Sequence, residues 1–352
     1  MTSFYNGISG IKTHQSGIDV WANNIANVNT VGYRANMPEF ASLFSTAVGN
    51  LSTATTNDLG QGSRLQSTAI SLKQGATVGT DNALDLAIIG EGWFGLNNGE
   101  SPMLFTRNGN LSRDATGYMV DQSRNHLLGT SANNIVDGVL TERLDTLAYS
   151  PISTPLYIPE TLTSPARPTT EISMKRNINP TSDAASQRIS STIVNAAGEE
   201  IVTLTFTKQA TQPESGSSWD VVATLGSLTN PSETVTSTAV FSDIGELSTT
   251  PSITIGGVAV NFGSGFTGLT AFDGDVLGEY VTQNGVVEGS RTGYRIDSNG
   301  TIVASFSNGD SSIVGRIPIY HFQNDQGLQK IGDNLFVETD NSGKGFLYTN
   351  PE

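Results

Sequence analysis

The chain has 352 residues, of which 36% are hydrophobic, and it carries a formal net charge of −15 and no cysteine. The lack of cysteine excludes disulfides, thiol catalysis and cysteine-based zinc sites, and the acidity disfavours nucleic-acid partners because it repels phosphate backbones. The length predicts two or three domains, and the high content of glycine, serine and threonine favours turn-rich β structure.

Residues 1–34 predict a long amphipathic helix, the only long one in the chain. Apolar side chains recur there at heptad spacing, which is typical of a helix that packs along one stripe. The opposite face carries Lys12, Gln15, Asp19 and Asn23. The positions assigned to the stripe, as an assembly helix, are Phe4, Ile8, Ile11, Ile18, Trp21, Ile25 and Val28.

An amphipathic helix must bury its stripe, and no second helix of comparable length is evident. Isolated helices are marginal in water, so this one needs a partner. Two interpretations stay open. The helix lies across the chain's own sheet, or it packs with another chain in an assembly.

The helix is predicted to close in the stretch "ANNIANVNTVGYR", residues 22–34. Asparagine is a poor helix former, but its amide can bridge packed helices or bond backbone carbonyls at a helix end. Asparagine is also common near helix ends without any partner. Gly32 stands where a C-cap is expected, after Thr30. The residues of interest in this stretch are Asn23, Asn24, Asn27, Thr30, Gly32 and Tyr33.

Residues 35–75 are rich in Ser, Thr, Gly and Gln and weakly periodic, which predicts an extended linker. From residue 76 the chain reads as short strands separated by turns. Hairpin turns are expected at the Asn-Gly pairs 108–109, 299–300 and 308–309, and at Thr116-Gly117. Strands are expected over 301–306 and 314–322.

The middle of the chain differs in character from both flanks. A proline-rich stretch, residues 150–172, reads as an extended connection. Residues 181–283 are rich in Ser, Thr and Val and predict a small outer β domain inserted into a loop of an inner one. The inner β domain is then discontinuous, over 76–180 and 284–352. The predicted fold is mainly β, with an N-terminal amphipathic helix and two β domains.

The sequence indicates no catalytic, metal or cofactor site. The histidines at 14, 126 and 321 lie far apart in sequence, and neither a nucleophile elbow nor a phosphate-binding loop is present. The segment "GSGFTG", residues 263–268, has dinucleotide-motif spacing, but no helix pattern follows it, so a loop between strands is the better interpretation. The N-terminus lacks the features of a cleavable signal peptide, and no apolar run is long enough for a membrane helix.

Three blocks of sequence resemble the bacterial flagellar rod and hook family. They are "ANNIANVNTVGYR", "GWFGL…FTRNGNLSRDATGYMVDQSRNHLLG" and "YRIDSNGTIVASFSNGDSSIVGRIPIYHFQNDQGLQKIGDNLFVETDNSGKG". They span the chain in the order that the family has. Because distal rod members lack an inserted domain of the size of 181–283, the resemblance favours the hook branch.

The resemblance implies a non-enzymatic structural subunit that self-assembles into a curved tube and transmits torque from rod to filament. It implies partners among copies of the same chain, the flagellar rod, hook cap and hook–filament junction proteins, and the export apparatus. It also implies an extracellular place in the flagellum, reached by type III export without a cleaved signal peptide. Family members end in a second amphipathic helix, whereas this chain stops at "GFLYTNPE"; that C-terminal axial helix is expected to be absent.

The resemblance further suggests an export element of the Phe-x-x-x-apolar type. Phe40 and Phe44 in "EFASLF" fit that spacing, and on a transient helical turn both rings would share one face. The competing interpretation is that the two rings anchor the linker to the β body. For the whole chain, the alternatives are a distal rod or junction protein of the same family, or a secreted β-rich enzyme or adhesin.

Overall fold

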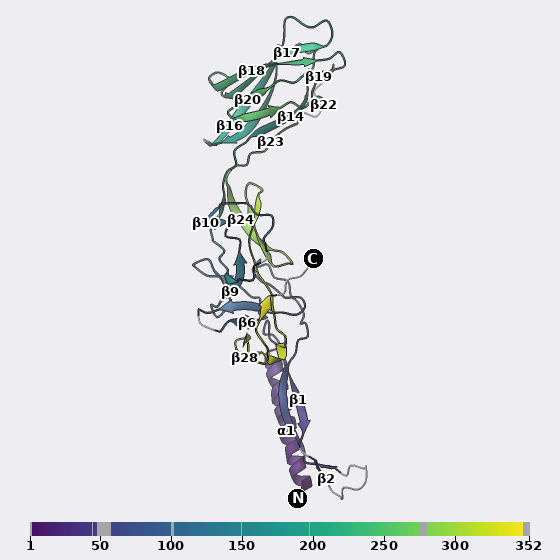
Figure 1. Ribbon diagram of the computed structural model, residues 1–352, viewed down its shortest axis with the longest axis vertical. Coiled ribbons are helices and arrows are strands. Elements are labelled where there is room, and N and C mark those ends of the chain that lie inside the picture. Colours follow the sequence, from purple (N-terminus) through teal and green to yellow (C-terminus); the bar gives the residue numbers. More distant parts are fainter. Residues whose placement is uncertain are drawn as a thin grey trace.

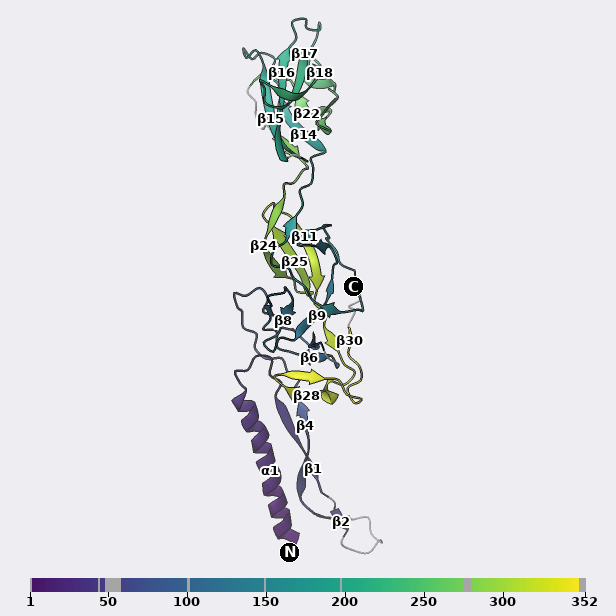
Figure 2. The same cartoon turned by 90° about the vertical axis from the view of Figure 1, so that its left-hand side faces the viewer.

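The molecule is long and thin, and its parts follow one another along the longest axis (Figure 1). The computed structural model describes residues 2–43, 45–47, 58–99, 102–148, 150–196, 198–274 and 280–347. Figure 2 shows the N-terminal helix beside a narrow β ribbon at one end, one β domain in the middle and another at the far end. The predicted fold class is confirmed: one N-terminal helix and two β domains, the second inserted into the first.

Helix α1 spans Thr2–Ala26 and is shorter than predicted. After Ala26 the backbone turns, because the Val28 N–H donates to the Ile25 carbonyl at 3.2 Å and the Thr30 N–H to the Asn27 carbonyl at 3.0 Å. Asparagine side chains that bond the nearby backbone compete with the helix, and the Asn27 amide does so by donating to the Asn23 carbonyl at 3.0 Å. The predicted helix over residues 1–34 was therefore wrong in its last turns.

The segment predicted as an extended linker forms a two-stranded antiparallel ribbon instead. Strand β1 (Asn36–Ser42) pairs with β4 (Ser63–Ile70), with a register shift between Glu39 and Phe40. Beyond it, β2 (Ser45–Ala47) pairs with β3 (Asp58–Gly60). Neither β1 nor β4 has a fully buried face, so their sequences lack the strict alternation that marks a strand.

The middle domain is a sheet built from two separate stretches of chain. Its path runs β10-β11-β13-β24-β25-β26-β9-β5-β6-β29-β28, so groups of strands from the first stretch lie next to groups of strands from near the C-terminus. The first stretch gives β5 (Phe94–Asn97), β6 (Leu104–Thr106), β7 (Ser112–Arg113), β8 (Met119–Val120), β9 (His126–Ser131), β10 (Ile135–Val136), β11 (Val139–Leu140), β12 (Thr154–Pro155) and β13 (Thr163–Ser164). The second gives β24 (Gly289–Ile296), β25 (Thr301–Phe306), β26 (Ser311–Arg316), β28 (Gln329–Gly332) and β29 (Leu335–Val337). Beside this sheet lie the paired strands β27 (Tyr320–His321) and β30 (Phe346–Leu347) and the 3₁₀ turn η1 (Asp325–Gly327).

Most of the predicted turns are present, but one is not. Thr116-Gly117 joins β7 to β8, and the Asn-Gly pairs at 299–300 and 308–309 join β24 to β25 and β25 to β26. The pair at 108–109 makes no hairpin, because the strands before and after it pair elsewhere. Gly109 instead lies against the backbone of Leu86, whose N–H donates to the Gly109 carbonyl at 2.8 Å.

The far domain is a second sheet with the path β15-β16-β17-β18-β19-β22-β14-β21-β20, and β23 also pairs with β14. It comprises β14 (Glu171–Asn177), β15 (Gln187–Asn195), β16 (Gly198–Lys208), β17 (Ser217–Gly226), β18 (Pro231–Phe241), β19 (Glu246–Thr249), β20 (Ile253–Ile255), β21 (Val258–Asn261), β22 (Gly265–Thr270) and β23 (Tyr280–Gln283). Strand β14 falls inside the range predicted for the inner domain, yet it pairs in this sheet. The chain therefore passes from the middle domain to the far domain where the proline-rich stretch ends, before residue 181.

Each β domain has its own hydrophobic core. Trp219, Phe206 and Phe241 are buried in the far domain. The middle domain has one core around Leu96 and Leu127, and a smaller one that contains Trp93 and Phe336. Because the apolar clusters do not merge, we expect the two domains to unfold separately.

Candidate functional site: the N-terminal helix and its junction

One face of helix α1 packs on the ribbon through small polar side chains. The Ser9 hydroxyl donates to the Ser63 carbonyl at 2.6 Å and accepts the Ser63 N–H at 3.0 Å. The Thr13 hydroxyl donates to the same carbonyl at 2.7 Å. Gly17 is buried under the Phe40 ring, and a Cβ at that position would lie only 2.9 Å from Phe40 Cζ. Small residues thus let the ribbon approach the helix closely.

The apolar stripe lies on another side of the helix and is exposed. Six residues of the stripe are more than half exposed, with exposed fractions of 55% to 76%. They are Phe4, Ile11, Ile18, Trp21 and Ile25 in the helix and Val28 in the turn after it. Ile8 is half-buried. Large apolar side chains that form a contiguous exposed patch mark an interaction site. The helix thus has an intrachain partner and still presents its stripe to water.

The charged side chains of α1 are also exposed and do not interrupt the stripe. Lys12 and Asp19 point to solvent, at positions that a helical wheel places away from Ile11 and Ile18. Gln15, four residues after Ile11 and three before Ile18, instead borders the stripe, contrary to the prediction that placed it on the opposite face. The helix therefore has an exposed apolar face, a polar face, and a small-residue face that is already covered by the ribbon.

Asn24 fastens the ribbon to the helix, and the neighbouring asparagines bond side chains of the turn that follows the helix. The Asn24 amide donates to the Asn36 carbonyl at 2.7 Å, and its oxygen accepts the Asn36 N–H at 3.0 Å. The Tyr33 hydroxyl donates to Asn23 Oδ1 at 2.8 Å, and the Thr30 hydroxyl to Asn27 Oδ1 at 3.2 Å. These contacts lie within one chain, which gives the asparagine cluster a local structural reason.

The junction also docks on the middle domain. Gly32 has φ +72°, and a Cβ there would lie 2.5 Å from the Asn108 backbone, so only glycine fits this turn. It follows the helix by six residues and is not its C-cap, contrary to the prediction. The Asn334 amide donates to the Val31 carbonyl at 3.2 Å, and Lys330 Nζ lies 4.1 Å from the centre of the Tyr33 ring.

A buried guanidinium group, that of Arg34, anchors the same junction. Arg34 is only 7% exposed and donates to the carbonyls of Lys73 at 2.7 Å and Ser71 at 3.4 Å. Burial lowers the pKa of Arg34. Burial, and to a smaller degree the charge of Arg34, lowers the pKa of Arg107 to about 10, so Arg107 stays charged at neutral pH.

Replacing Asn24 by alanine should detach the start of the ribbon from the helix. The variant loses both bonds to Asn36 and leaves that backbone pair without a partner, at a cost of about 1–3 kcal/mol. Hydrogen exchange of the amides in 36–42 should accelerate, while exchange in the far domain stays unchanged. The matched control is Asn29→Ala, an exposed asparagine of the same turn. Equal protection of residues 36–42 in both variants would contradict this role of Asn24.

The other features predicted from the sequence are not part of the apolar stripe. Of the predicted export pair, Phe40 is 46% exposed with its ring 5.9 Å from that of His14, and Phe44 lies outside the described residues. The segment 263–268 enters strand β22 rather than a helix. Among the described residues, no group of His, Cys, Asp and Glu side chains could hold a metal ion. No helix in the described ranges is long and apolar enough to cross a membrane.

Sequence reasoning missed the face of α1 that the ribbon covers. Ser9, Thr13 and Gly17 recur every four residues, which places small side chains on one helical face. That spacing was the available signal. It was hidden by the stronger heptad pattern of the apolar stripe.

The fold and the helix define an elongated structural protein with an exposed apolar face on its N-terminal helix. Two protein-family models match the chain. The model described as "Flagella basal body rod protein" matches residues 4–34, and the model described as "Flagellar hook protein FlgE/F/G D1 domain" matches residues 87–203. The flagellar hook protein FlgE of Salmonella typhimurium is 26% identical over 99% of this chain and 86% of its own length. The chain belongs to the flagellar rod and hook family, and the relatives that match nearly all of it are hook proteins.

Further relatives support the same assignment. FlgE of Borreliella burgdorferi is 28% identical over 98% of this chain and 86% of its own. The basal-body rod protein FlgG of Bacillus subtilis is 35% identical, but over 38% of this chain and 53% of its own. The crystal structure of Helicobacter pylori flagellar hook protein FlgE2 matches with a TM-score of 0.53 and 17% identity, covering 76% of this chain and 95% of that one, which shows a shared fold.

Proposed function

We propose that this chain is the structural subunit of a flagellar hook and that it polymerises through the exposed stripe of helix α1. The observation that carries this is the stripe itself, since Ile11, Ile18 and Ile25 stay in water although the helix already packs on its own ribbon. Contact with α1 of neighbouring copies would bury these side chains. The α1 helices then form the core of the tube.

The β domains would lie outside that core. Their order along the molecule, with the middle domain next to the helix and the far domain beyond it, supports a middle and an outer layer (Figure 1). We take residues 171–283 as the outer domain and the flanking sheet as the inner domain. In a tube that transmits torque, neighbouring copies would meet through these layers as well.

The remaining partners follow from the family. We infer contacts with rod proteins at one end of the hook, with the hook cap during growth, and with junction proteins at the filament end. We also infer an extracellular position, reached through the flagellar export apparatus without a cleaved signal peptide.

Immunogold labelling tests the proposed function directly. Antibodies against the outer domain should label the short curved segment between the cell envelope and the filament of the native bacterium. Deletion of the gene should remove both that segment and the filament beyond it, and plasmid-borne expression should restore them. Label along the filament or on the cell surface would refute a hook subunit.

The double variant Phe40→Ala with Phe44→Ala should block export. In the folded chain the Phe40 ring lies over Gly17 and near His14, so an export element containing it would act before the ribbon packs on the helix. The subunit should accumulate in the cytoplasm and disappear from the secreted fraction, as measured by immunoblot.

The control for this experiment is Phe272→Ala, which removes an aromatic ring of the same exposure, 46%, from the outer domain. It should be secreted normally. Normal secretion of the double variant together with a lowered thermal transition would instead favour a packing role for the two rings.

A further inference from the structure

The inner and outer domains are joined by a connector of two chain segments, residues 165–170 and 284–288. The segments are tied to each other at one level, where the Arg167 N–H donates to the Val286 carbonyl at 2.7 Å and the Val286 N–H to the Arg167 carbonyl at 2.9 Å. Pro165 and Pro168 flank Arg167 and restrict the backbone of the outgoing segment. Figure 2 shows the connector as the narrowest part of the molecule.

The outer end of the connector is built into the outer domain. Asn284 Oδ1 accepts the N–H groups of Thr170 at 2.9 Å and Glu171 at 3.1 Å. The Asn284 amide donates to Thr170 Oγ1 at 2.7 Å, and the Thr169 hydroxyl donates to Gln283 Oε1 at 2.9 Å. Movement between the domains must therefore occur on the inner side of these bonds.

At the inner end, the tip of the β25–β26 hairpin, residues 307–310, contacts both segments. The Asn308 amide donates to the carbonyl of Val287 in the returning segment at 2.8 Å. Arg167 of the outgoing segment donates through Nη2 to Asp310 Oδ1 at 3.0 Å and Oδ2 at 3.3 Å. The hairpin tip thus holds the connector from the inner domain.

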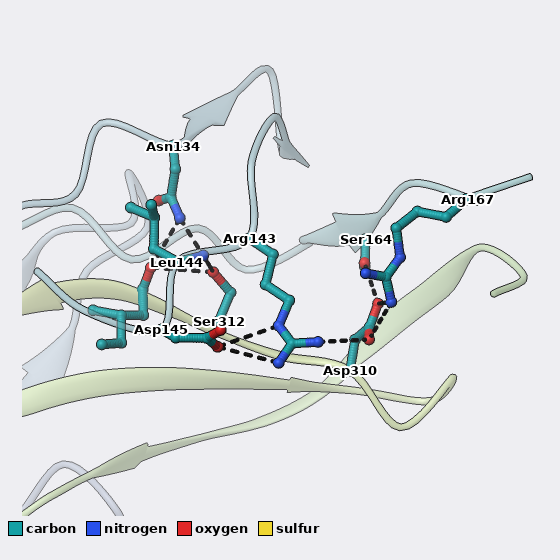
Figure 3. A network of polar contacts seen from close by, with 9 residues as sticks. Asn134, Arg143, Leu144, Asp145, Ser164, Arg167, Asp310 and Ser312 are labelled. Carbon is teal, nitrogen blue, oxygen red and sulfur yellow. Dashed lines mark hydrogen bonds and ion pairs between the residues drawn. The ribbon is translucent and has the colours of Figure 1, made fainter. Parts of the chain in front are cut away.

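Asp310 is the centre of this arrangement, as Figure 3 shows. Its side chain is only 11% exposed, and it accepts the Ser164 hydroxyl at 3.3 Å. Arg143, which also pairs with Asp145, approaches it to 3.6 Å from the inner domain. One sheltered carboxylate therefore lies between a guanidinium of the inner domain and a guanidinium of the connector.

We propose that the hairpin tip 307–310 is a latch that fixes the direction in which the outer domain leaves the inner domain, with Asp310 and Arg167 as its positioning residues. With the pair intact, the connector continues the direction of the β25–β26 hairpin. Without it, the Arg167–Val286 bridge still joins the two segments, but the outer domain can tilt as a body. For the hook this rests on the proposed function, where the latch would limit how far the outer layer sways as the tube turns.

The latch can be tested on the free monomer by the distance between two spin labels. The chain has no cysteine, so Ser298→Cys in the inner domain and Thr254→Cys in the outer domain, both at exposed positions, give a single labelled pair. Pulsed electron paramagnetic resonance then measures the distribution of the distance between the labels. Neutralising the latch with Arg167→Gln or Asp310→Asn should broaden this distribution.

Salt gives a second measurement on the same samples. Raising the ionic strength to about 1 M shortens the screening length to about 3 Å. Because Asp310 is sheltered and sheltered pairs are screened less, salt should broaden the distribution of the labelled chain with an intact latch by less than Arg167→Gln does, and it should change the distribution of Arg167→Gln little. The matched control is Arg295→Gln, which removes an arginine of the inner domain whose partner, Asp297, is two residues away. It should leave the distribution unchanged.

An Arg167→Gln distribution as narrow as that of the unsubstituted chain would overturn the proposal. If Asp310→Asn lowers the thermal transition of the inner domain, the result for Arg167→Gln decides whether the latch exists. The Arg167 side chain is 49% exposed, so its replacement leaves both hydrophobic cores intact. Because the measurement uses monomers, its failure is distinct from a failure of the proposed hook function, which would appear in the labelling of hooks.

Discussion

Replacing Ile18 by aspartate should abolish polymerisation while both β domains stay folded. Ile18 lies in the middle of the exposed stripe of α1, and its contact with neighbouring copies would place the new carboxylate in an apolar seam. A buried unpaired charge costs several kcal/mol or more, and the cost repeats at every subunit of the polymer. Electron microscopy of cells that express the variant as their sole copy should show no hooks, and the cells should not swim.

The control is Lys12→Asp, which places a carboxylate on the polar face of the same helix, where Lys12 is exposed. It should assemble, because its carboxylate remains in water. Circular dichroism and the thermal transitions of both purified monomers should match the unsubstituted chain. Normal hooks from the Ile18→Asp chain would show that the stripe is not the assembly surface.

Replacing Phe206 by alanine should destabilise the outer domain and leave the inner domain unaffected. Phe206 is fully buried in the core of the outer domain, and truncation of a core phenylalanine costs about 3–5 kcal/mol. For a domain of this size, that loss lowers the melting temperature by on the order of 10–20 °C. Because the cores of the two domains are separate, effects at one should not reach the other.

Differential scanning calorimetry should therefore show one transition that moves and one that does not. Phe266→Ala serves as the control, because Phe266 belongs to the same domain but is about half exposed, and it should shift neither transition by more than a few degrees. A single transition that moves as a whole would mean that the two domains unfold as one cooperative unit.

Features with strong, regular patterns were predictable from the sequence. The heptad repeat of Phe4, Ile11 and Ile18 identifies the helix and its stripe, because an apolar repeat of this period over several turns fits an α-helix and not a strand. The Asn-Gly pairs at 299–300 and 308–309 identify hairpins, because few turns other than the hairpin types favour that pair. Strand β25 was predicted with its observed ends.

Features that depend on distant parts of the chain were not predictable. The ribbon of β1 and β4 was not predicted. It packs on the small-residue face of α1, so neither strand needs the regular apolar face by which a strand is predicted. No hairpin forms at 108–109, where the Gly109 carbonyl instead accepts the N–H of Leu86, a residue distant from it in sequence. The roles of Asn24 and Arg34 depend on carbonyls brought near by the ribbon and by residues 71–73.

The division of helix α1 into a packed small-residue face and an exposed stripe has a thermodynamic consequence. Since folding of the single chain leaves Ile11, Ile18 and Ile25 hydrated, their transfer from water remains available as free energy of association. Association of this kind is driven by entropy near room temperature, lowers the heat capacity, and strengthens with warming and with sulfate. The contribution of α1 to assembly should therefore grow as temperature rises, so the critical concentration for growth should fall with warming and rise with cooling.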